Sequence, residues 1–108
     1  MRLVEVPAPA PGDVAALVAQ AAAALGLTIA LDGTLKAYPG SRHWHLRRGS
    51  ERGTLEVTWW PAQRRLWFKV AAGRTGAWIE QDLPRLQARL SAPGSAGAVL
   101  VSAPPTER

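Results

Sequence analysis

Apolar side chains recur every three or four positions between residues 13 and 26, which is the spacing of a helix that buries one face. Asp13 stands where an N-cap residue belongs, because its carboxylate can accept hydrogen bonds from the first free backbone amides. Gly26 suits the position just beyond the helix, where φ is often positive. The pattern therefore predicts a first helix between these two residues.

Residues 27–31 alternate between larger apolar side chains and Thr or Ala, which is the period of a β-strand. The Asp-Gly pair at residues 32–33 has two interpretations: a tight hairpin turn, or a bulge within one strand that continues to Ala37. The pattern does not decide between them. The Tyr-Pro-Gly-Ser sequence at residues 38–41 is typical of a turn, and residues 42–48 are expected to form the next strand.

Residues 54–60 and 65–71 are the two clearest strands, and four residues join them. If these four residues form the loop, each apolar residue on the core face of one strand faces an apolar residue of the other. On the opposite face Glu56 meets Lys69, a pair of opposite charges that stabilises a sheet. The register predicts an antiparallel pair with one buried face. The expected core residues of the sheet are Trp44, Leu46, Leu55, Val57, Trp59, Leu66, Phe68 and Val70.

A second helix is predicted towards the end of the chain, where four apolar residues fall on one stripe: Ile79, Leu83, Leu86 and Leu90. Pro84 restricts where this helix begins, because proline lacks an amide proton and is tolerated only in the first turn. We therefore expect Asp82 to be the N-cap, with residues 77–81 as a short preceding turn.

The order helix, strands, helix predicts an α+β fold. It is a two-layer sandwich in which an antiparallel meander of three or four strands carries both helices on one face. The 108 residues suffice for one domain, 1–108. Within it we expect an ordered core at about 13–91, a proline-rich lead-in at 7–12, and a flexible tail of Ala, Pro, Gly and Ser at 92–108.

Charge is unevenly distributed along the chain. The whole sequence has 13 basic and 8 acidic side chains, a formal charge of +5. Between Lys36 and Arg74 lie nine basic and two acidic residues, giving that segment +7 and the remainder −2. Such segregation indicates a basic face that attracts nucleic acid, anionic lipid or an acidic protein. The alternative is a solvated surface in a chain whose composition favours Arg and Ala.

Several function classes are excluded or disfavoured. The chain has no Cys, which removes disulfides, thiolate metal sites and thiol nucleophiles. Glu5 and the prolines after it interrupt any signal-peptide core, and residues 14–31 are too rich in Ala to make a good membrane span. We expect a cytoplasmic protein without a membrane partner. Because no nucleophile elbow, phosphate loop or dinucleotide motif is present, we expect a binding protein without a cofactor rather than an enzyme.

Alternation places a mixed set of side chains on the sheet face opposite the core: His43, His45, Arg47, Glu56, Thr58, Trp60, Trp67 and Lys69. Cations that contact phosphates, combined with rings on which bases stack, are typical of surfaces that bind single-stranded nucleic acid. The predicted binding residues are His43, His45, Arg47, Trp60, Trp67 and Lys69, with Arg42, Arg65 and Arg74 extending the phosphate contacts. The expected partner is RNA or DNA, single-stranded or structured, or an acidic protein.

Two further hypotheses involve the same face. His43, His45 and Glu56 have the composition of a two-histidine, one-carboxylate metal site. The sequence argues against a metal site for two reasons. Pairing with Lys69 already explains the carboxylate of Glu56 on this face, and the surrounding Arg residues repel a cation. No metal is therefore predicted.

The alternative function is a homodimer or protein-interaction module that buries the face. Five Trp residues exceed what so small a core easily encloses, and exposed Trp and Arg are enriched at interface hot spots.

Overall fold

The computed structural model describes residues 1–93, so the predicted tail lies almost entirely outside the described residues. Its elements are, in chain order, β1 (Arg2–Val6), α1 (Val14–Ala24), β2 (Thr28–Gly33), β3 (Arg42–Arg47), β4 (Leu55–Trp60), a 3-10 turn (Pro61–Gln63), β5 (Arg65–Val70) and α2 (Ala77–Leu90). Within residues 1–93, no helix is both long enough and apolar enough to cross a membrane.

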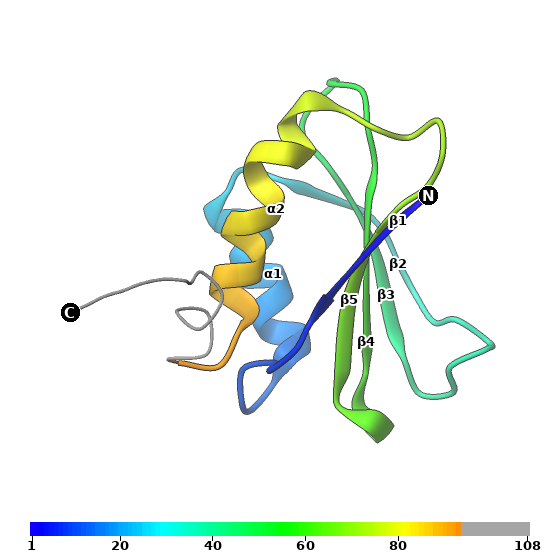
Figure 1. Cartoon of the computed structure of the whole chain (residues 1–108), viewed down its shortest axis with the longest axis vertical. Helices are drawn as coiled ribbons and strands as arrows, with labels where there is room; N and C mark the ends of the chain where they lie inside the picture. The colour runs from blue at the N-terminus through cyan, green and yellow to red at the C-terminus, as the bar shows by residue number, and fades with distance from the viewer. Residues whose placement is uncertain (94–108) are drawn as a thin grey trace.

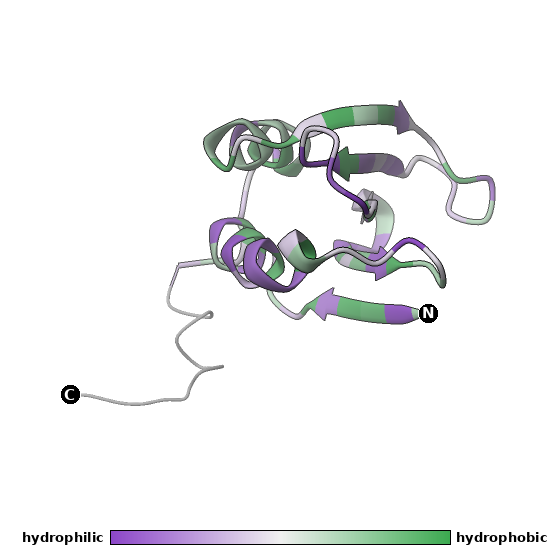
Figure 2. Cartoon of the chain, turned by 90° about the horizontal axis from the view of Figure 1, so that it is seen from above, coloured by the Kyte–Doolittle hydropathy of each residue, from purple (hydrophilic) through white to green (hydrophobic). Residues whose placement is uncertain are grey.

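The strands form one antiparallel sheet in the order β1-β5-β4-β3-β2, and both helices lie on the same side of it (Figures 1 and 2). This arrangement confirms the predicted α+β sandwich, with five strands instead of three or four. All eight predicted sheet core residues are buried, together with the predicted stripe of α2. The core therefore lies between the sheet and the two helices, and the other sheet face carries no helix.

β1 is the strand that the sequence pattern did not reveal. It pairs with β5, for example Val4 with Phe68, and so forms one edge of the sheet. Only Val6 of this strand is buried, while Leu3 and Glu5 are exposed. The alternation is weak because an edge strand buries few side chains, and the partner residues in β5 lie at least 60 positions away in sequence.

The proline-rich segment that follows β1 runs beside the end of α2. The Ala10 amide donates to the Leu90 carbonyl at 2.9 Å, and the Ala92 amide donates to the Ala8 carbonyl at 2.7 Å. Pro9 and Ser91 form an isolated bridge between these segments. Proline is tolerated in such a segment, because an isolated bridge forms few backbone hydrogen bonds and does not need the amide proton that proline lacks.

The first helix has the predicted bounds and caps. Asp13 accepts a hydrogen bond from the Ala16 amide at 3.0 Å, and Gly26 has φ +72°. The Asp-Gly pair at 32–33 neither turns the chain nor bulges, because β2 ends at Gly33 and residues 34–41 connect it to β3. The bulge lies earlier, between Ile29 and Leu31.

The predicted start of the second helix is wrong. α2 begins at Ala77 with Gly76 as N-cap, so Asp82 and Pro84 both lie inside the helix. Pro84 is an exposed residue, and so is Glu80, whose carbonyl has no amide partner at position 84. Asp82 is buried, for a reason that has nothing to do with capping: its carboxylate pairs with Arg48 on the sheet side and with Arg85.

Candidate functional site

The sheet face opposite the helices is called the open face below. The strand registers set Thr58 opposite both His43 and Trp67, and Glu56 opposite both His45 and Lys69. Directly opposed residues share a face, so the alternation predicted from the sequence is confirmed. Extending the registers to the edge strands gives the side chains of the open face: Leu3, Glu5, Thr28, Leu31, His43, His45, Arg47, Glu56, Thr58, Trp60, Arg65, Trp67 and Lys69.

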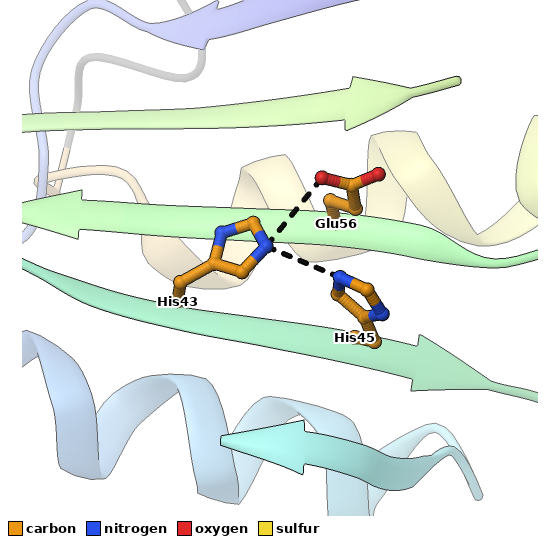
Figure 3. A group of neighbouring side chains, drawn as sticks. All are labelled: His43, His45 and Glu56. Atoms are coloured by element: carbon orange, nitrogen blue, oxygen red, sulfur yellow. Dashed lines mark hydrogen bonds and ion pairs between the residues drawn. The ribbon is translucent and has the colours of Figure 1, made fainter. Parts of the chain in front are cut away.

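Two histidines and a glutamate meet at the centre of the open face (Figure 3). His43 and His45 are two residues apart on β3, and Glu56 comes from the neighbouring strand β4. His43 Nε2 lies 3.2 Å from His45 Nε2 and 3.4 Å from Glu56 Oε1. On its other side, His43 Nδ1 lies 2.8 Å from the hydroxyl oxygen of Thr58. Both ring nitrogens of His43 therefore have polar neighbours.

Burial determines the charge of His43, although no helix covers this face. The side chain is 8% exposed, and desolvation lowers its pKa below 6.5. Glu56 acts in the opposite direction, while electrostatic interactions with His45 and Lys69 lower the pKa further. The imidazole is therefore neutral at physiological pH. One ring nitrogen carries a proton and the other offers a lone pair.

Three aromatic rings form a second cluster on the open face. The centroid of the Tyr38 ring lies 5.0 Å from the ring centroids of both Trp60 and Trp67, and the rings meet edge-on. The Trp60 indole N–H donates to the Pro39 carbonyl at 3.0 Å, so the connection between β2 and β3 is attached to this end of the face. The sequence predicted both tryptophans here but treated Tyr38 only as a turn residue.

A shallow pocket opens beside Trp67. It is lined by Leu3, Glu5, Tyr38, Arg65 and Trp67. Arg65 lies over the Trp67 ring, 5.2 Å from its centroid, and donates two hydrogen bonds to the Glu5 carboxylate at 2.9 and 3.1 Å. These hydrogen bonds hold the pKa of Glu5 below its usual 4.5. Two of the lining residues come from β1, so the missed strand supplies one wall of the pocket.

The remaining predicted cations are distributed over the molecule. Arg42 pairs with Trp59 in the register, which puts it on the helix side of the sheet, where its guanidinium bonds Asp32 at 3.0 and 3.1 Å. Arg74 lies in the connection between β5 and α2, where its carbonyl accepts a hydrogen bond from the Thr54 amide at 3.0 Å. The placement of Arg42 therefore does not support its predicted contribution to the phosphate contacts of the open face, and the contribution of Arg74 stays a prediction.

The uneven charge along the chain is partly neutralised by folding. Three arginines of the basic segment form ion pairs with carboxylates from outside that segment. The pairs are Arg65 with Glu5, Arg42 with Asp32 and Arg48 with Asp82. Arg47 donates to the Glu51 backbone carbonyl, and within residues 1–93 neither Arg47 nor Lys69 forms an ion pair with a carboxylate. These two cations are the ones that the open face can offer to an anionic ligand.

Comparison with known proteins found no significant match to this chain among family models, curated proteins or solved structures. An α+β sandwich by itself does not define a function, because unrelated activities occur on the same fold. The function therefore has to be argued from the residues of the open face.

Proposed function

We propose that this domain binds single-stranded nucleic acid on its open face. The observation that carries the proposal is the combination, on a sheet face without helices, of an aromatic pocket and two cations that have no carboxylate partner. Neither feature alone is specific. Together they supply the two interactions on which sequence-tolerant binding of single strands depends, base stacking and phosphate neutralisation.

The pocket beside Trp67 suits a planar base. Tyr38 and Trp67 provide ring surfaces, and the Arg65 guanidinium already lies over the Trp67 ring. A base that stacks on an aromatic ring gains about 1–3 kcal/mol. Because Glu5 neutralises Arg65, stacking and not charge is the main contribution expected from this end of the face.

Arg47 and Lys69 are the proposed phosphate contacts. Arg47 ends β3, and Lys69 lies on β5 opposite Glu56, so the two cations flank the histidine cluster across the sheet. Each phosphate neutralised by a cation releases bound counterions, which makes the affinity fall as salt rises. A single strand crossing the face would thus contact cations near its middle and rings at one end.

The test is a titration of labelled single-stranded and duplex oligonucleotides, followed by fluorescence anisotropy at several salt concentrations. We expect tighter binding of the single strand. Lys69→Gln and Arg47→Gln should each reduce the slope of log affinity against log salt by about 0.7. The matched control is Arg89→Gln, because Arg89 is an exposed cation on α2 in the other layer. Absence of binding at low salt, or equal losses in the control, would contradict the proposal.

A second variant tests stacking separately from charge. Trp67→Leu keeps an apolar side chain at the pocket but removes the ring, and it should weaken binding by about 1–3 kcal/mol without changing the salt slope. If Trp67→Leu reduces the slope of log affinity against log salt as much as the variants of the two cations do, the ring contributes only by positioning Arg65.

A homodimer is the second candidate, and two exposed leucines favour it. Leu3 on β1 and Leu31 on β2 are 59% and 44% exposed, and they lie at opposite edges of the open face. Leucines so placed are suited to contact a second copy. Sedimentation should then give a dimer that Leu31→Ser dissociates, whereas a monomer at all concentrations rules this candidate out.

A further inference from the structure

The central cluster of the open face has the dimensions of a metal site. One ligand atom from each of His43, His45 and Glu56 lies within 4.8 Å of the other two. An ion bound tetrahedrally at the usual zinc distances holds its ligand atoms about 3.3–3.4 Å apart. The two separations from His43 Nε2, 3.2 Å to His45 Nε2 and 3.4 Å to Glu56 Oε1, already match two of the three edges between these ligand atoms (Figure 3).

Thr58 orients the central ligand of this cluster. A histidine that binds a metal through Nε2 carries its proton on Nδ1, and that proton needs an acceptor. The Thr58 hydroxyl oxygen lies 2.8 Å from His43 Nδ1 and is buried with it. This hydrogen bond fixes the plane of the His43 ring and leaves Nε2 directed at the two other ligands.

The two objections raised by the sequence lose force in the structure. Lys69 opposes Glu56 in the register, but within residues 1–93 Glu56 forms no ion pair with Lys69, and its Oε1 lies 3.4 Å from His43 Nε2. Of the surrounding arginines, Arg42 lies on the helix side of the sheet and Arg65 is neutralised by Glu5. Ion pairing and placement thus reduce the positive charge that opposes a cation, although Arg47 and Lys69 still flank the cluster without a carboxylate partner among the described residues.

We propose that His43, His45 and Glu56 bind one divalent transition-metal ion, with Zn²⁺ as the best-suited ion. Two imidazoles and a carboxylate, without any thiolate, form a ligand set that zinc accepts in sites with three protein ligands. His45 and Glu56 are only partly buried, so solvent has access and supplies the fourth ligand. This metal site does not depend on the proposed nucleic-acid binding, and each can be tested without the other.

The first experiment is a titration of the tag-free protein with Zn²⁺ by calorimetry, with Co²⁺ as a spectroscopic substitute. We expect one ion per chain and the visible absorption of four-coordinate cobalt. His45→Ala and Glu56→Gln should each weaken binding by roughly tenfold or more. The matched control is Glu51→Gln, because Glu51 is an exposed carboxylate in the loop after β3 and should leave the affinity unchanged.

A second experiment needs no variant, because His43 and His45 are the only two histidines in the chain. One equivalent of Zn²⁺ should shift the imidazole ¹⁵N signals of both rings together in NMR spectra, with metal bound at Nε2 of each ring. The proposal is overturned if neither ring responds, if one ion binds per two chains, or if both ligand variants bind zinc as tightly as the unmodified protein.

Discussion

Asp82 provides the sharpest test of how the fold is held together. Its carboxylate is 2% exposed and accepts hydrogen bonds from Arg48 at 2.7 and 3.1 Å and from Arg85 at 3.2 Å. Arg48 also donates to the Leu25 carbonyl at the end of α1. One buried carboxylate thus links the sheet to both helices, so Asp82→Ala should destabilise the packing between the two layers.

Asp82→Ala is expected to lower the free energy of unfolding by about 2–3 kcal/mol. Removing one partner of a fully buried ion pair costs about 3–5 kcal/mol, whereas an exposed pair contributes about 0–1. Arg48 is 32% exposed and keeps the Leu25 carbonyl as an acceptor, so the value falls between these limits. Asp13→Ala is the matched control, because it removes a true N-cap, which is worth about 1 kcal/mol.

The assay is urea unfolding followed by circular dichroism, in which Asp82→Ala should lower the midpoint by roughly 1–2 M. A double-mutant cycle with Arg48→Met should give a coupling energy of about 1–3 kcal/mol. If Asp82→Ala costs no more than Asp13→Ala and the coupling with Arg48 is near zero, the carboxylate does not link the layers and the reasoning fails.

Three further predictions concern other parts of the molecule. Pro84→Ala should raise stability by about 2 kcal/mol in the same urea assay, because it restores a helical hydrogen bond on an exposed face; an unchanged or lower midpoint refutes this. The pKa of Glu5 in an NMR titration should lie below 4.5 and rise in Arg65→Gln, since the contribution of this pair to stability is complete above pH 4.5 and is lost as pH falls through the lowered pKa. Thr58→Val should weaken zinc binding roughly 10–100-fold in calorimetry, because the Nδ1 proton of His43 loses its acceptor, and equal affinity would show that this hydrogen bond does not orient the ligand.

The parts of the fold that depend on local pattern were predictable from the sequence. Helix α1 lies between an N-cap and a glycine that both have specific local conformations. The pairing of β4 with β5 is fixed by a short connection and by alternation, and Val57 opposes Phe68 and Glu56 opposes Lys69 as predicted. Period-two alternation also places the predicted histidines and tryptophans on one face of the sheet.

The features that depend on distant contacts were not predictable. β1 has little alternation of its own and is recognisable as a strand only beside β5. Asp82 has the residue type of a cap, and only the position of Arg48 explains its burial. The same holds for the candidate site, because Glu56 turns towards His43 and not Lys69 through side-chain conformation, which sequence spacing does not encode.

The edge position of β1 has a consequence for the order of folding. Strands β3, β4 and β5 pair through short connections, whereas β1 pairs with a strand at least 60 residues away. Such contacts form slowly because long loops cost entropy to close. An edge strand that docks last is also expected to detach first in the native state. Detachment removes Leu3 and Glu5 from the wall of the pocket and frees Arg65. The positive charge beside Trp67 would then be controlled by the local unfolding of a five-residue strand.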